Sequence, residues 1–118
     1  MALQHASPGQ VIALSPYGSQ IATAKSIALF KSEDLEVMRL VLLAGKEMPS
    51  HRVAGEITIQ CIEGSVEVTA ENATHVLRPG HLLYLSGHSL HAVVALEDAS
   101  ILVTVVLKRT AGQGGAPA

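Results

Sequence analysis

Histidine is the residue type through which this chain of 118 residues could do chemistry. Its six copies stand at positions 5, 51, 75, 81, 88 and 91. His5 lies in the N-terminal leader, and His75 and His81 flank a turn, which is typical of solvated imidazoles. His51 and His91 instead adjoin apolar runs. An imidazole in such a place can ligate a metal, exchange a hydrogen bond with a ligand, or move a proton.

Short apolar runs must position these histidines. Val66 and Val68 alternate with polar neighbours, as in a half-buried antiparallel strand, whereas runs 40–43 and 101–106 are apolar on both faces. A run of the second kind needs cover on its second face, from another sheet or a partner subunit. The predicted strands are residues 26–31, 35–43, 56–62, 65–70, 74–77, 82–85, 91–96 and 100–107. Their regular spacing predicts an all-β sandwich or barrel.

Composition excludes several classes of protein. Hydrophobic residues make up 48% and charged residues 15%, so the chain can bury the core of one domain. The net charge is −2 and the aromatics are two Tyr, one Phe and no Trp, which argues against a nucleic-acid partner. The single cysteine cannot form an internal disulfide. We expect a cytoplasmic protein, because no run is long enough to span a membrane and no signal peptide is recognisable.

Two segments resemble the motifs of the cupin family of small β-barrel proteins, within residues 35–107. The first family motif reads G-x5-H-x-H-x3,4-E-x6-G, and here Gly45, His51 and Gly64 occupy its first glycine, first histidine and closing glycine. The second reads G-x5-P-x-G-x2-H-x3-N, and here Gly80 and His91 match. The resemblance implies a cupin-type double-stranded β-helix, which is a jelly-roll barrel of two antiparallel sheets.

The same resemblance implies a divalent metal ion, held in cupins by two histidines and a glutamate of the first motif and the histidine of the second. His51 and His91 keep two of these four places, while Val53 and Ile57 occupy those of the other histidine and the carboxylate. Two imidazoles alone would hold a metal weakly, because catalytic centres use three protein ligands. The second motif has three further replacements, of its proline, glycine and asparagine, by Ser86, His88 and Ala95.

A neighbouring residue could supply the third ligand. Glu56 is one position out of register, and a β-bulge would be needed to turn it inward. Cys61 shares the strand face of the missing carboxylate, where it is either a soft ligand or a small buried hydrophobic residue. His88 stands at the turn and could reach the barrel mouth. The predicted metal ligands are His51, Glu56 and His91.

Two main functions stay open at this stage. We predict a small cupin that binds a small molecule, a divalent metal or both in the barrel cavity, with unassigned activity. The alternative is a metal-dependent enzyme, such as a dioxygenase, decarboxylase or isomerase, that acts on a small polar metabolite. Apolar residues at two ligand positions favour the first. The candidate pocket residues are Val53, Ile57, Cys61, Tyr84 and His88.

The chain is predicted to form one domain with two appendages. Residues 1–24 would be a leader with one extra strand, residues 25–108 the cupin barrel, and residues 109–118 a flexible tail of small residues. We expect a homodimer, because cupins usually dimerise and because the strands that are apolar on both faces need a second surface. A protein whose barrel mainly builds such a dimer is a third functional class.

Overall fold

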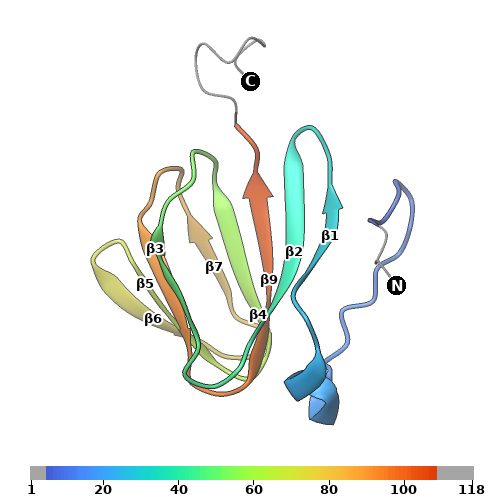
Figure 1. Cartoon of the computed structure of the whole chain (residues 1–118). Helices are drawn as coiled ribbons and strands as arrows, with labels where there is room; N and C mark the ends of the chain where they lie inside the picture. Colours follow the sequence, from blue (N-terminus) through green and yellow to red (C-terminus); the bar gives the residue numbers. More distant parts are fainter. Residues whose placement is uncertain (1–4, 109–118) are drawn as a thin grey trace.

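Two antiparallel sheets face each other in the computed structural model, which describes residues 5–108 (Figure 1). The strands are β1 (Ile27–Lys31), β2 (Leu35–Leu42), β3 (Glu47–His51), β4 (Ile57–Glu63), β5 (Val66–Ala70), β6 (Ala73–Leu77), β7 (Leu82–Leu85), β8 (His91–Ala95) and β9 (Ala99–Val106). The five-stranded sheet has the order β1-β2-β9-β4-β7, and the four-stranded sheet has the order β3-β8-β5-β6. The predicted all-β jelly roll is confirmed. No helix in the described residues is long and apolar enough to cross a membrane.

Eight of these strands coincide with the predicted runs to within one residue at each end, and β3 is the strand that the sequence did not reveal. Its residues Glu47–His51 were interpreted as a loop because they are mostly polar and include Pro49. Strand β3 is an edge strand that pairs only with β8, and a proline is tolerated there because one side of the strand needs no ladder hydrogen bonds.

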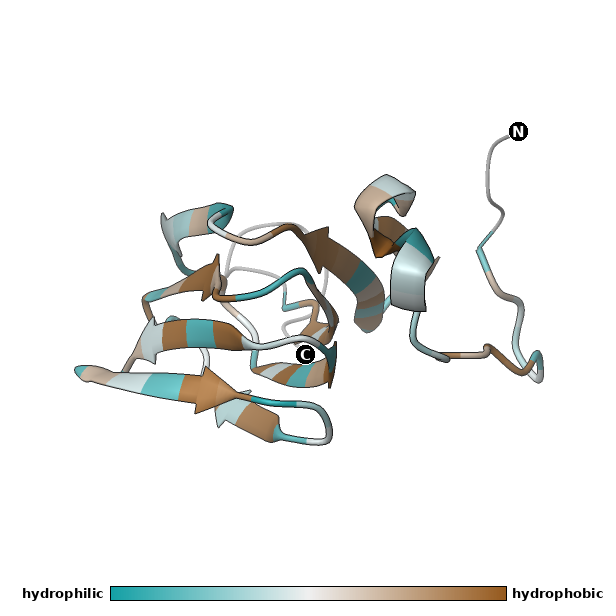
Figure 2. Cartoon of the chain, turned by 90° about the horizontal axis from the view of Figure 1, so that it is seen from below, coloured by the Kyte–Doolittle hydropathy of each residue, from teal (hydrophilic) through white to brown (hydrophobic). Residues whose placement is uncertain are grey.

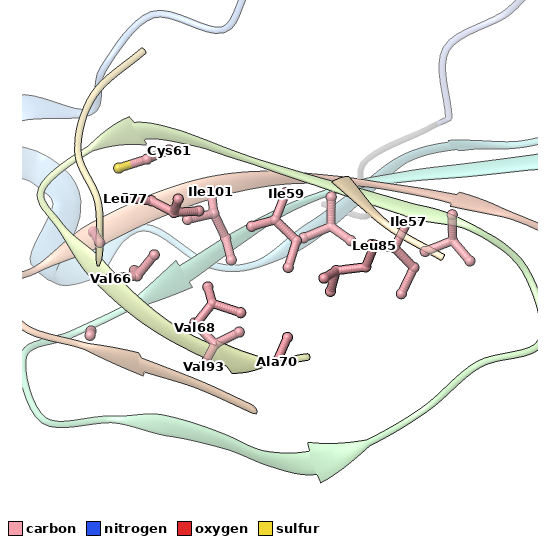
Figure 3. Packing of buried hydrophobic residues seen from close by; sticks show 14 residues of the cluster. Ile57, Ile59, Cys61, Val66, Val68, Ala70, Leu77, Leu85, Val93 and Ile101 are labelled. Atoms are coloured by element: carbon pink, nitrogen blue, oxygen red, sulfur yellow. The ribbon is translucent and has the colours of Figure 1, made fainter. Parts of the chain in front are cut away.

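Alternation along the strands directs one apolar row of each sheet into the core, and the hydropathy bands along the strands are visible in Figure 2. Ile59 of β4 and Ile101 of β9 are 2% and 1% exposed, and they face Val68 and Val93 of the other sheet. Cys61 lies at one end of the buried cluster and Ile57 at the opposite end (Figure 3). The core therefore fills the space between the sheets.

The N-terminal segment lies against the outside of the five-stranded sheet (Figures 1 and 2). The predicted extra strand is absent from its described residues, 5–24, which instead contain a 3-10 helix, Gly18–Thr23. The amide of Ala6 donates to the carbonyl of Leu29 at 2.8 Å, so the leader covers part of the edge strand β1. Residues 1–4 and the predicted tail, residues 109–118, lie outside the described residues.

A buried ion pair on the outer face of this sheet fastens the segment. Arg39 of β2 is 4% exposed, and its guanidinium donates to the carbonyl of Ser15 at 2.7 Å and to the Glu63 carboxylate at 3.2 Å. The ring of Tyr17 covers the guanidinium, with its centroid 3.9 Å away. Ser100, also on the outward face, donates to Glu63 at 2.7 Å and is fully buried. The leader thus covers part of the second face of the sheet.

The carboxylate of Glu63 is the acceptor at the centre of this network. Burial alone would raise its pKa, but the amides of Tyr17 and Gly18, the Ser100 hydroxyl and the Arg39 cation outweigh burial and hold the pKa below its ordinary value of 4.5. The two amide bonds measure 2.9 and 3.1 Å. The ionised carboxylate therefore stabilises the docked position of the N-terminal segment.

Candidate functional site

A cavity of about 290 Å³ lies between the two sheets at one end of the barrel. Its walls are mostly apolar and come from both sheets: Met38, Leu40, Met48, Val53, Ile57, Ile59, Val93, Ile101, Val103, Val105 and Leu107. Its polar or charged side chains are Glu36, His51, His91 and Lys108. Small-molecule sites of proteins have this composition, with apolar walls that bind the body of a ligand and a few polar groups that orient it.

The two histidines singled out by the motifs meet at this cavity. His51 ends β3 and His91 begins β8, and the two residues are direct partners in the antiparallel ladder. Their ring centroids are 4.4 Å apart, and the ring planes are inclined by 54°. His91 is only 4% exposed, whereas His51 is exposed. The imidazoles lie side by side because of the register between β8 and β3, the edge strand that the sequence did not reveal.

Backbone carbonyls fix both imidazoles in the same tautomer. Nδ1 of His51 lies 3.1 Å from the carbonyl oxygen of Pro49, and Nδ1 of His91 lies 2.9 Å from that of Ser89. A carbonyl can only accept, so each Nδ1 carries the proton, and in the neutral ring Nε2 holds the lone pair. No residue in the described part of the chain hydrogen-bonds either Nε2. Two acceptors are therefore left for a ligand.

The structure does not bring Glu56 to these imidazoles. Glu56 is exposed, and its carboxylate accepts a hydrogen bond from the Tyr84 hydroxyl in a shallow groove that Thr58 and Thr104 also line. The bulge that would have turned it inward is absent, because β4 pairs in unbroken register with both neighbours over its first residues, 57–60, and its register shift toward β9 lies farther on, between Cys61 and Glu63. Among residues 5–108, no group of three His, Cys, Asp or Glu side chains is placed to hold a metal ion.

Tyr84 is a candidate pocket residue that faces away from the cavity. It is 60% exposed on the edge strand β7, and its hydrogen bond to Glu56 raises the pKa of the phenol above its ordinary value of 10. Val53 and Ile57, by contrast, line the cavity. The inward row of β4 thus carries apolar side chains where cupins carry a ligand.

Cys61 and His88 do not line the cavity either. Cys61 is fully buried at the other end of the core, where its thiol lies 3.5 Å from the carbonyl oxygens of Glu63 and Gly64, and burial raises the pKa of the thiol. His88 has a positive φ of 64° and lines a separate polar depression, which shares only His91 with the cavity. Neither is in a position to act with the histidine pair.

Glu36 and Lys108 line the cavity and were not singled out from the sequence. Alternation within β2 could have revealed Glu36, because it occupies the same face as Met38 and Leu40. A charged residue near the start of a strand is more often solvated, so the pattern alone did not distinguish it. Lys108 follows the last strand and carries no pattern of its own.

Comparison with known proteins shows which of them this chain resembles. No family model matches the chain. L-ectoine synthase from Hahella chejuensis is 34% identical over 62 residues, which cover 51% of this chain and 47% of that enzyme. The match thus spans about half the length of this relative.

Solved structures agree over most of the chain. A cupin-superfamily protein from Desulfitobacterium hafniense has a TM-score of 0.72 and 17% identity, and the alignment covers 91% of this chain and 99% of that one. An RmlC-like cupin from Shewanella frigidimarina has a TM-score of 0.69 and 20% identity, with 91% and 94% covered. The chain has the cupin fold, and the fold that its motifs implied is thereby confirmed.

Proposed function

We propose that this cupin binds a small molecule in its barrel cavity, with an apolar body inside and a hydrogen-bond donor facing the imidazoles of His51 and His91. The observation that carries the proposal is the pair of carbonyl-fixed rings beside a mostly apolar cavity of about 290 Å³. Ligand cavities in proteins span roughly 300–1,000 Å³, so this one suits a small metabolite.

Two contributions favour binding. The apolar walls gain free energy when a ligand removes them from water, at about 25 cal/mol per Å² of apolar surface. Nε2 of the buried His91 has no hydrogen-bond partner among residues 5–108, and a donor on the ligand would replace the hydrogen bonds to water that this nitrogen loses when the ligand binds. The ring contact with His51 orients the second acceptor beside it.

A divalent metal is the cofactor that the fold implies, and the residues present do not fit a complete metal centre. The structure supplies two imidazole nitrogens, while apolar Val53 and Ile57 line the positions of the other two ligands. Catalytic metal centres usually have three protein ligands. We therefore derive no chemical step through a metal.

A metal-dependent enzyme is the second candidate, and one observation favours it. Histidines that ligate metals usually donate their other ring N–H to a carbonyl or carboxylate, as both rings do here. Metal analysis of protein purified without chelators tests this candidate, with His51→Ala as the site variant and His75→Ala as the control. Stoichiometric metal that only His51→Ala loses would support a metal enzyme, and a metal-free wild type would eliminate it.

Binding of small probes tests the first candidate. We would titrate benzyl alcohol, cyclohexylmethanol and isoamyl alcohol and follow them by ligand-observed NMR. Val53→Phe places a larger side chain in the cavity, whereas Val76→Phe makes the same change on the outer surface of β6. Binding that Val53→Phe abolishes and Val76→Phe preserves would support the proposal. Identical binding to both variants, or none to the wild type at millimolar concentration, would contradict it.

A homodimer in the cytoplasm stays part of the proposal. The exposed side chains of Leu82 (62%) and Tyr84 (60%) on the edge strand β7 support a protein contact there. Sedimentation equilibrium would test it, because a Leu82→Glu variant should dissociate a dimer that uses this edge. A wild type that sediments as a monomer at micromolar concentration would contradict the dimer.

A further inference from the structure

Glu36 is the one acidic residue among the described residues that line the cavity. It belongs to the inward row of β2, whose next members are Met38 and Leu40, and it is half-buried. In the neighbouring strand its partner is Val105, a core residue with 9% exposure. A carboxylate in this row is unusual, because a charged group loses hydration there unless something compensates for it.

Within residues 5–108, no basic side chain forms an ion pair with Glu36. Lys31, on the neighbouring strand β1, is the ladder partner of Glu36, and Lys108 lines the cavity. The ion pair found within residues 5–108 instead joins Arg39 to Glu63. Glu36 therefore lines the cavity without an ion-pair partner among residues 5–108. A positively charged group on a ligand would supply one.

We infer that the cavity selects a small apolar amine, whose ammonium group binds the Glu36 carboxylate; this rests on the proposed small-molecule function. The fixed polar groups of the walls are the carboxylate and two Nε2 lone pairs, and all three accept hydrogen bonds. A primary ammonium group offers three donors and no acceptor. The donor that lines the cavity, the Lys108 ammonium, is exposed and can turn to solvent.

The positive charge belongs to an organic ligand and not to a bound metal ion. Glu36 comes from the five-stranded sheet and the imidazoles of His51 and His91 from the four-stranded sheet, and within the described chain these groups do not approach closely enough to share a metal. A molecule that extends across the cavity can place its ammonium group at one wall and a second donor at the other.

Matched pairs of amines and alcohols test the inference. Benzylamine with benzyl alcohol, and cyclohexylmethylamine with cyclohexylmethanol, differ mainly in the charge and the number of donors. Dissociation constants at pH 7 would be measured by NMR for the wild type and for Glu36→Gln, which keeps the size of the side chain. Glu67→Gln is the control, because Glu67 is half-buried on β5 but does not line the cavity.

We expect the wild type to bind each amine roughly tenfold more tightly than its alcohol, the ratio that one charge-assisted hydrogen bond gives. Glu36→Gln should weaken amine binding roughly tenfold and alcohol binding less than about twofold, and Glu67→Gln should change neither. Equal affinity of the wild type for amine and alcohol would overturn this inference and leave the small-molecule function intact. Failure of every probe to bind the wild type at millimolar concentration would overturn both.

Discussion

Replacement of Glu63 by alanine tests how the N-terminal segment is held against the barrel. The substitution removes the acceptor of two backbone amides and of the Ser100 hydroxyl, and it leaves the Arg39 cation without its negatively charged partner. The side chains of Arg39 and Glu63 are 5% and 13% exposed, so water cannot fully solvate the remaining charge. Loss of one partner from a buried ion pair costs about 3–5 kcal/mol.

We expect Glu63→Ala to lower the free energy of unfolding by about 3 kcal/mol, the lower end of that range, because the freed amides of the leader can bind water. In a domain of this size the loss corresponds to a fall in Tm of roughly 12–20 °C. Urea denaturation followed by circular dichroism would measure the change. The double variant R39M/E63L should be more stable than Glu63→Ala, because it leaves no buried charge unpaired.

The control for this experiment is Glu67→Ala, which removes a half-buried glutamate from the outward row of β5. It should change the stability by less than about 0.5 kcal/mol. A loss below about 1 kcal/mol for Glu63→Ala, or a double variant less stable than the single one, would refute the reasoning.

Three further predictions concern pH, a turn and the thiol. The pKa of Glu63 is held below 4.5 in the folded chain, so the stabilisation by its carboxylate is complete above that pH and decreases on acidification. The urea midpoints of the wild type and Glu63→Gln should therefore differ at pH 7 and converge toward pH 3. A difference that stays constant with pH would contradict this. Gly64→Ala should lower the free energy of unfolding by more than about 3 kcal/mol, because its Cβ would lie 2.1 Å from the carbonyl oxygen of residue 98. Gly45 also has a positive φ but has open space around it, so Gly45→Ala should lower the free energy of unfolding by only about 1 kcal/mol in the same urea assay. Equal losses in the two variants would be inconsistent with the contact at Gly64. Cys61 should react with iodoacetamide only after unfolding, because its thiol is buried and its pKa raised; rapid labelling of the native protein would disagree.

The sequence allowed most of the fold to be predicted because the strands alternate and are separated by turn residues. The register of β4 followed from alternation, since Ile57, Ile59 and Cys61 all face the core. Strand β3 escaped because edge strands tolerate polar residues and proline, so burial leaves little trace in their sequence.

The candidate site was predictable where the family motifs fix the position of a residue. His51 and His91 were found because the spacing of the family motifs places them, and the β3–β8 register brings their rings together. The inward turn of Glu56 depended on a local bulge, which alternation cannot predict, and the structure has none there. Glu36 was missed because a single carboxylate near a strand end has no pattern that distinguishes it from a solvated one.

Methyl NMR of the protein labelled at Met and Ile tests the central claim most directly. Addition of benzylamine should shift the methyl signals of Met38 and Ile59, which line the cavity, and leave that of Ile27, on β1 outside the cavity lining, unchanged. The same titration of Val53→Phe should show no shift at Met38 or Ile59. Shifts confined to Ile27, or unchanged spectra at millimolar ligand, would contradict a ligand site inside the barrel.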